Sequence, residues 1–262
     1  MSGIKFKNLS FSYEGKEVFN NLNFTLRKDK SLSIISPSGH GKTTLLKLLN
    51  NELLYSGEIT INGLNVDVDN VDKTNEIIKV VFRNSKFICE TVKDELLYGL
   101  NQNNVSKKEI ENRLDDINLF FNIKHLYNCK LVDLNDNDRI LIKILSYAIM
   151  EPSYIALDDL FLFLNNRTEI LLLNYLNYKN IILINVTSDL EDVLYTDYVL
   201  CLFDGKSAID GKTIDVLKNE KILKRLGFSL PFMVDLSIQL QAYNLISKMY
   251  LNKEAMVRNL WK

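Results

Sequence analysis

The feature that most constrains the fold is the segment 36–44, Ser-Pro-Ser-Gly-His-Gly-Lys-Thr-Thr, which lies between two apolar runs. The run before it, 32–35, is typical of a buried strand, and the run after it, 45–49, is typical of a helix. A loop in this context matches the phosphate-binding pattern G-x-x-x-x-G-K-[ST], except that Ser36 replaces the first glycine. The order of strand, tight loop and helix predicts an α/β fold.

The residue types in this loop suit the binding of a nucleoside triphosphate. Glycines at 39 and 41 let backbone N–H groups turn toward an anion, and the helix that begins near Lys42 adds its positive dipole end. The Lys42 ammonium suits the β- and γ-phosphates, and the Thr43 hydroxyl suits Mg²⁺. We predict nucleotide contacts from Ser36, Pro37, Ser38, Gly39, His40, Gly41, Lys42, Thr43 and Thr44. The alternative is an ordinary strand-to-helix turn with a chance lysine.

A second polar element follows the apolar run 155–157 and consists of Asp158 and Asp159. The carboxyl ends of parallel strands meet at one edge of a sheet, so this pair is expected beside the phosphate loop. There Asp158 would hold Mg²⁺ through water, and Asp159 would orient the attacking water. Two aspartates after a strand more often cap a turn, but the phosphate loop favours the catalytic interpretation.

Composition narrows the function classes. The 262 residues carry 32 lysines and arginines against 33 aspartates and glutamates, so no basic field predicts a nucleic-acid partner. The cysteines at 89, 129 and 201 match no metal-ligand spacing and are expected to be reduced thiols. No apolar stretch approaches the roughly 18 residues of a membrane span, and the first residues do not resemble a signal peptide. Membrane association is therefore expected to come through partners.

Hydrophobic patterning outlines the rest of the chain. Strands are predicted at 4–9, 59–61, 77–82, 154–157, 181–185 and 198–202, the last four typical of buried parallel strands. Residues 82–154 are mostly helical in pattern, with a capping box formed by Ser106 and Glu109 and a further helix over 139–150. After Gly211 the pattern becomes helical again.

These elements resemble the ATP-binding subunits of ABC transporters along essentially the whole chain. Within that family the chain is most similar to the ATPase subunits of energy-coupling factor (ECF) transporters, which import vitamins and metal ions. The segments that carry the closer resemblance are 81–84, 87–96, 98–100, 226–232, 236–237 and the pair Leu260-Trp261.

The resemblance implies an architecture and partners. Residues 1–211 would form an ABC-type P-loop nucleotide-binding domain with an antiparallel β subdomain and, at about 85–150, a helical subdomain. Residues 212–262 would form a helical C-terminal extension and a candidate dimerisation region. The implied protein is a peripheral ATPase dimer at the cytoplasmic face of the cell membrane. It would bind ATP and Mg²⁺ and work with a transmembrane coupling subunit and a substrate-binding membrane subunit.

Matched position by position, the resemblance assigns further site residues. Tyr13 would stack on adenine, although a plain strand-end tyrosine is the alternative, and Asp158 matches the Mg²⁺ aspartate. Three positions depart from the family: Arg83 replaces a glutamine, Asp159 a glutamate and Ser188 the switch histidine. A guanidinium near the metal would repel it yet would also neutralise γ-phosphate charge. The shorter carboxylate and the missing imidazole predict slow hydrolysis in this chain's own pocket.

The segment in the place of the family's L-S-G-G-Q signature departs furthest: Leu134, Asn135, Asp136, Asn137 and Asp138. In the family this segment, at the start of a helix, completes the pocket of the opposite protomer. Aspartates there would oppose phosphate charge, and the loss of glycine would hinder close approach of the backbone. The alternative is that Asp136 and Asp138 are simply helix caps.

These departures leave two functions open. One is an ATPase subunit whose ATP binding and hydrolysis drive uptake through an ECF-type transporter. The other is a catalytically impaired partner in a heterodimer whose second subunit hydrolyses ATP. A heterodimer is favoured over a homodimer, because a homodimer would combine every defect in both pockets. A soluble ABC protein outside transport is a third alternative, which the C-terminal resemblance disfavours.

Overall fold

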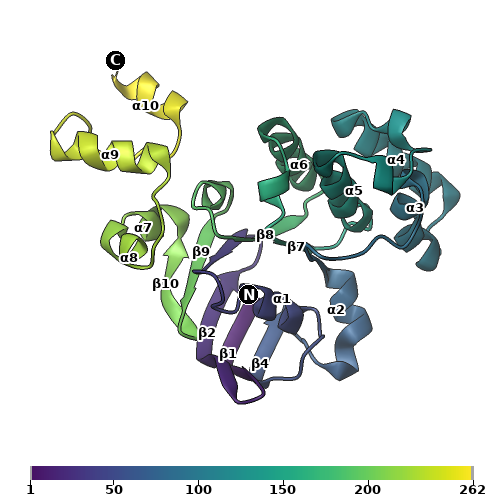
Figure 1. Ribbon diagram of the computed structural model, residues 1–262, viewed down its shortest axis with the longest axis horizontal. Helices are drawn as coiled ribbons and strands as arrows, with labels where there is room; N and C mark the ends of the chain where they lie inside the picture. Colours follow the sequence, from purple (N-terminus) through teal and green to yellow (C-terminus); the bar gives the residue numbers. More distant parts are fainter. Residues whose placement is uncertain (1, 261–262) are drawn as a thin grey trace.

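The computed structural model describes residues 2–260 and contains two β-sheets surrounded by helices (Figure 1). The strands are β1 (Ser2–Tyr13), β2 (Lys16–Arg27), β3 (Leu32–Ile35), β4 (Ser56–Ile61), β5 (Leu64–Asn65), β6 (Ile78–Val81), β7 (Tyr154–Asp158), β8 (Ile182–Thr187), β9 (Tyr198–Phe203) and β10 (Lys206–Lys212). The helices are α1 (Lys42–Leu49), α2 (Val71–Ile77), α3 (Val92–Gln102), α4 (Lys107–Phe121), α5 (Asp136–Ala148), α6 (Asn166–Tyr178), α7 (Thr213–Leu217), α8 (Glu220–Arg225), α9 (Phe232–Ala242) and α10 (Lys253–Leu260).

The larger sheet has the strand order β10-β9-β3-β8-β7-β6 and is parallel except at β10. The smaller sheet, β2-β1-β4-β5, is antiparallel. The α/β class and the four predicted parallel strands are thereby confirmed. Because β3, β8 and β7 are parallel neighbours, the residues that directly follow them meet at one edge of the sheet.

The parallel sheet is covered on both faces, as such a sheet requires. On one face, the leucines of α1 share a hydrophobic cluster with Phe6 of β1 and with Ile34 and Ile184 of the parallel sheet. On the other face, residues of α3, α4, α5 and α6 pack with Val81 and Leu157. Helix α1 is therefore held between the two sheets.

Helices α3, α4, α5 and α6 begin at polar caps, and two of these caps bear on the predictions. The Ser106 hydroxyl accepts a hydrogen bond of 3.3 Å from the Glu109 N–H, which confirms the predicted start of α4. Helix α5 begins at Asp136, three residues before the predicted start, and its cap is the Asn135 side chain, which accepts from the Asp138 N–H at 2.9 Å. The interpretation of Asp136 and Asp138 as caps is therefore wrong. Both lie in the first turn, where a carboxylate is favourable to the helix dipole.

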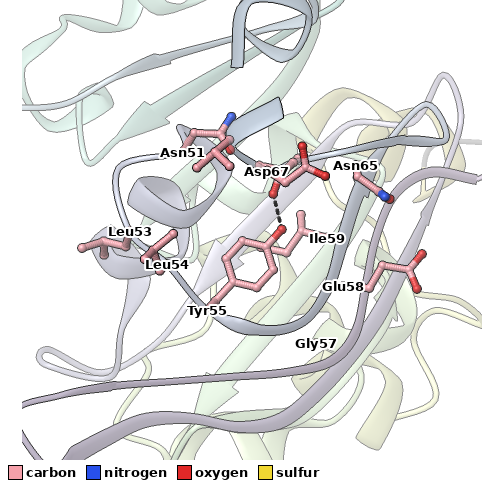
Figure 2. Close-up of a pocket in the computed structure, with 11 residues that line it drawn as sticks. Asn51, Leu53, Leu54, Tyr55, Gly57, Glu58, Ile59, Asn65 and Asp67 are labelled. Carbon is pink, nitrogen blue, oxygen red and sulfur yellow. Dashed lines mark hydrogen bonds between the residues drawn. The ribbon is translucent and has the colours of Figure 1, made fainter. Parts of the chain in front are cut away.

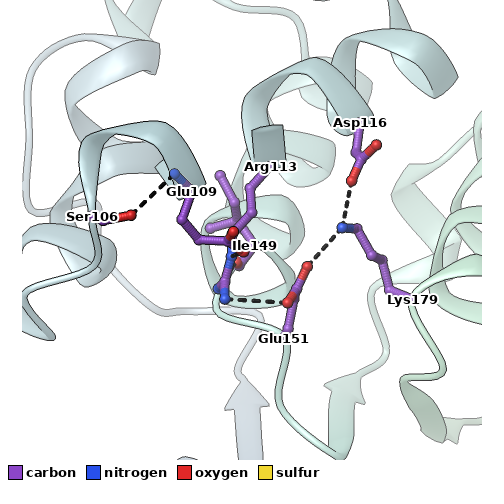
Figure 3. Close-up of polar contacts among 7 residues, drawn as sticks. All are labelled: Ser106, Glu109, Arg113, Asp116, Ile149, Glu151 and Lys179. Atoms are coloured by element: carbon purple, nitrogen blue, oxygen red, sulfur yellow. Dashed lines mark hydrogen bonds and ion pairs between the residues drawn. The ribbon is translucent and has the colours of Figure 1, made fainter. Parts of the chain in front are cut away.

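An ion network joins α4 and α6 to the segment between α5 and β7 (Figure 3). Glu151 forms an ion pair with Arg113 Nη2 at 3.2 Å and accepts a hydrogen bond from Lys179 Nζ at 2.6 Å. Arg113 also pairs with Glu109, and Lys179 also pairs with Asp116. All but Glu109 are largely buried, so these pairs are less screened than surface ion pairs. The network fixes α4 and α6 to the start of β7.

The C-terminal helices extend to one side of the molecule (Figure 1). Leu217 and Leu223 pack with Val199 of β9, whereas Phe232 at the start of α9 is 69% exposed. The helical pattern predicted after Gly211 is confirmed, and Trp261 lies outside the described residues. Across residues 2–260 we find no helix with the length and apolar character needed to cross a membrane.

Candidate functional site

The phosphate loop occupies the connection between β3 and α1, and its glycines have left-handed backbone angles. Gly39 has φ 82°, and Gly41, which precedes α1, has φ 90°. A Cβ on Gly41 would lie 2.8 Å from Val18 Cγ1 and 2.9 Å from Phe19 Cζ. Both the backbone angle and the neighbouring β2 side chains therefore require glycine at position 41.

Ser36, at the position of the missing glycine, is fully buried and needs no glycine. It is not among the residues with positive φ, and its hydroxyl donates to the Pro37 carbonyl at 2.9 Å. Its own carbonyl accepts a hydrogen bond from Lys42 Nζ at 2.7 Å. Serine thus satisfies its hydroxyl locally and leaves the loop conformation intact.

The Lys42 side chain connects the phosphate loop to the segment after β8. It is 8% exposed, and its ammonium also donates to Ser188 Oγ at 3.0 Å. Burial lowers the pKa of Lys42, and the nearby carboxylates of Asp159 and Asp158 partly offset that effect. A cation held in this way is positioned for a negatively charged ligand at the edge of the sheet.

Asp158 and Thr43 form an oxygen-rich pair beside this lysine. Thr43 Oγ1 donates to Oδ1 and Oδ2 of Asp158 at 3.2 and 3.1 Å. Burial raises the pKa of Asp158, and the Thr43 hydrogen bond acts against that shift. A cation would stabilise this buried carboxylate, and carboxylate and hydroxyl oxygens suit Mg²⁺. Within the described chain no group of three or more His, Cys, Asp or Glu side chains is placed to hold a metal ion.

Asp159 and Ser188 contact each other at the same edge. Asp159 Oδ1 accepts from the Ser188 N–H at 3.1 Å, and the Asp159 N–H donates to the Val186 carbonyl at 2.9 Å. Asp159 has φ 53°, a left-handed angle that aspartate tolerates better than most residues. The structure thus brings together Lys42, Asp158, Asp159 and Ser188, as expected from the positions after β3, β7 and β8.

Arg83 lies two residues after β6, and its partners were not foreseen from the sequence. Its guanidinium carbon is 4.6 Å from the centroid of the Phe163 ring, and its carbonyl accepts from Lys143 Nζ at 3.1 Å. Lys143 is buried, and desolvation lowers its pKa. Lys143 stands inside the apolar stretch 140–145, and a buried lysine of this kind indicates that its ammonium has a hydrogen-bond partner. Nothing in the sequence indicated a contact between Arg83 and Phe163.

The segment 134–138 lies at the start of α5. The Asp138 carboxylate accepts from Asn135 Nδ2 at 2.8 Å and from Asn137 Nδ2 at 3.1 Å. Asp136, with its side chain 82% exposed, pairs with Arg139 at 3.2 Å. In the part of the chain that the structure describes, these residues form no hydrogen bond with the phosphate loop. Their role toward a second protomer stays a prediction.

Two aromatic side chains belong to predicted site residues: Tyr13 at the end of β1 and His40 in the phosphate loop. The Tyr13 side chain is 40% exposed, and its ring meets Phe11 edge-on with centroids 4.7 Å apart. The His40 ring stacks on Phe203, with centroids 4.8 Å apart and planes 19° from parallel. The exposed Tyr13 ring leaves a face for a base, and its stacking on adenine stays a prediction.

A separate hollow of about 250 Å³ lies beside β4 and β5 (Figure 2). The Tyr55 hydroxyl inside it donates to the Val66 carbonyl, and burial raises the pKa of Tyr55 to about 12. None of the predicted site residues lines this hollow. It is therefore distinct from the polar edge of the parallel sheet.

Comparison with known proteins gives the family. A family model described as ABC transporter matches residues 19–161, more than half of the chain. The energy-coupling factor transporter ATP-binding protein EcfA1 of Mycoplasma genitalium is 28% identical over 242 residues, covering 90% of this chain and 88% of that protein. EcfA1 of Lactobacillus acidophilus is 28% identical over 256 residues, covering 92% and 89%.

A solved structure shares the fold. That of cbiO1 from Clostridium perfringens, described as part of the ABC transporter complex cbiONQ, has a TM-score of 0.74. At 21% identity it covers 86% of this chain and 94% of the other. The predicted resemblance to ECF ATP-binding subunits is confirmed by the curated relatives. With its phosphate loop, sheet order and family match, the chain belongs to the ABC transporter family as an ATPase domain.

Proposed function

We propose that this chain is the ATP-binding subunit of an ECF-type ABC importer and couples ATP binding and hydrolysis to uptake of a vitamin or metal ion. The observation that carries the proposal is the buried Lys42, which lies between the phosphate loop and Ser188 beside two carboxylates. Two curated relatives are named ECF transporter ATP-binding proteins, and each aligns over about nine-tenths of this chain.

The residues divide the work of holding the nucleotide. Tyr13 stacks on adenine, the loop N–H groups and Lys42 bind the phosphates, and α1 directs its positive end toward them. The Thr43 hydroxyl and, through water, the Asp158 carboxylate would hold Mg²⁺, which would supply neutralisation of phosphate charge.

Hydrolysis in this chain's own pocket is slow. Asp159 is one methylene shorter than glutamate, and one of its oxygens is already engaged by the Ser188 N–H. A serine hydroxyl at position 188 carries no positive charge for the γ-phosphate, and Lys42 uses it as an acceptor. A displacement of about 1 Å at such groups lowers rate by about 100-fold.

The partner of this chain is a second ABC ATPase with consensus residues. In a heterodimer, the altered catalytic residues of this chain face the consensus signature helix of the partner. The consensus catalytic residues of the partner face Asp136 and Asp138 of this chain. The dimer works with a transmembrane coupling subunit and a substrate-binding membrane subunit at the cytoplasmic face of the membrane. The extension 212–262, with the exposed Phe232, Tyr243 and Leu245, contributes to dimer contacts.

The second candidate function is a nucleotide-binding partner that does not hydrolyse ATP itself. The contact between Asp159 and Ser188 favours this candidate, because it ties together the two positions that depart from the catalytic pattern. The two candidates share binding of ATP and differ in turnover at the pocket of Lys42.

Isolation of the tagged chain from membranes of its own cell, with mass spectrometry and ATPase assays, tests the proposal. We expect a second ABC ATPase and a membrane subunit to co-purify, and turnover to be far faster in the complex than in the chain alone. Lys42→Met in this chain should reduce turnover of the complex if its pocket hydrolyses ATP. Recovery of a homodimer with fast turnover and no membrane subunit would contradict the proposal.

A further inference from the structure

The guanidinium of Arg83 lies over an aromatic ring and, within residues 2–260, forms no ion pair with a carboxylate. Arg83 is exposed, and Phe163 belongs to the 3-10 turn η4 (Phe161–Phe163), which begins three residues after Asp158. Arginine over an aromatic face at 4.6 Å is a favourable cation–π geometry. The ring therefore provides Arg83 with a defined position beside the site.

Asp158 is the competing partner for this cation. Burial raises the pKa of Asp158, and Arg83 is among the cations that act against that shift. A guanidinium that reached Asp158 would form a two-point ion pair and cover both carboxylate oxygens. In the structure both oxygens accept from the Thr43 hydroxyl instead. The Asp158 carboxylate and the Thr43 hydroxyl are the two groups that would hold Mg²⁺.

The backbone of Arg83 is also fixed. Lys143 of α5 donates to the Arg83 carbonyl at 3.1 Å, and its ammonium lies 5.4 Å from the centroid of the Phe87 ring. Because Lys143 is buried, the loop after β6 has a firm attachment at this point. With the backbone held there, the position of the guanidinium depends on the Arg83 side chain alone.

We propose that Phe163 is a positioning residue that keeps Arg83 off Asp158, so that the carboxylate stays open for Mg²⁺ when nucleotide binds. This inference rests on the proposed function of the site. It assigns Phe163 a role through Arg83, and the two side chains must therefore show coupled effects. Loss of the ring frees the guanidinium to compete with the metal for the same oxygens.

The test measures binding of a fluorescent ATP analogue to the purified full chain, in EDTA and across a Mg²⁺ titration. Phe163→Leu should raise about fivefold the Mg²⁺ concentration at which the enhancement of analogue binding is half-maximal. A cation–π contact of ordinary strength corresponds to a factor of this size in the equilibrium constant. Its affinity in EDTA should not fall. Phe163→Tyr keeps a ring face and should behave as wild type.

The double variant Phe163→Leu/Arg83→Gln separates positioning from packing. Without a competing cation, its Mg²⁺ midpoint should return to within about twofold of wild type, and Arg83→Gln alone should not raise the midpoint. A double variant as impaired as Phe163→Leu would overturn the proposal, as would an unchanged midpoint in Phe163→Leu. If Phe163→Leu fails to fold, a raised midpoint in Arg83→Gln alone overturns it. Wild-type chain that binds no ATP in either condition refutes the proposed function itself.

Discussion

Replacing Lys42 with methionine tests the assignment of the phosphate loop. The change removes a buried ammonium that donates to the Ser36 carbonyl and to Ser188 Oγ. An ammonium about 4 Å from one unit of phosphate charge contributes about 4 kcal/mol at an effective dielectric near 20. Giving up the Ser188 contact for the phosphate offsets about 1.5 kcal/mol. The net of about 2.5 kcal/mol corresponds to a roughly 60-fold rise in the Kd for ATP.

The same substitution should leave the fold intact, which separates weaker binding from unfolding. Burial lowers the pKa of Lys42, so the folded chain holds the charged form at a net disadvantage. Methionine has a similar length without a charge to desolvate. This gain offsets the hydrogen bond that the buried Ser36 carbonyl loses, so the free energy of unfolding without ligand should stay close to that of wild type in Lys42→Met.

Isothermal titration with ATP and Mg²⁺, paired with thermal unfolding of each variant, measures both effects. Lys47→Met is the matched control, because Lys47 is a second lysine on α1 and, among the described residues, its side chain forms no hydrogen bond or ion pair with the site. Its Kd should stay within about twofold of wild type, since surface charges at a distance are largely screened. An ATP affinity for Lys42→Met within twofold of wild type would refute the reasoning.

Three further predictions concern turnover, dimerisation and pH. Asp159→Glu with Ser188→His should raise ATP turnover more than either change alone, because both groups act on one transition state; fast turnover by the unmodified chain would contradict this. Asp136→Gly with Asp138→Gln should strengthen ATP-dependent dimerisation with the partner, measured by sedimentation. Unchanged dimerisation with an intact fold would contradict the idea that these aspartates oppose phosphate charge in the partner's pocket. Burial raises the pKa of Asp192 from 3.8 to about 6. The folded chain thus binds this proton more tightly than the unfolded chain, and stability is lost as pH rises from about 4 through about 6, by at most about 3 kcal/mol. Asp192→Asn should flatten that part of the profile in urea unfolding, and an unchanged slope would show that Asp192 does not cause it.

The sequence predicted those parts of the site that depend on neighbouring residues in the chain or on the strand topology. The loop 36–44 carries its own glycines, lysine and threonine, and the positions after β7 and β8 follow from parallel topology alone. The start of α5 was placed too late, because Asp-Asn-Asp is typical of a turn and the cap is instead Asn135. Phe163 could not be found, since a phenylalanine among leucines looks like core and its contact with Arg83 depends on tertiary packing.

The Glu151 carboxylate gives strand β7 an anchored end. Glu151 joins Arg113 and Lys179, and three residues later the strand begins, buried at every position, and ends at Asp158. A fully buried strand that is hydrogen-bonded on both sides does not stretch or bend easily, so β7 is a rigid element. Glu151 therefore connects α4 and α6 to the strand that carries Asp158, so the helical part of the molecule and the candidate nucleotide site share one continuous set of contacts.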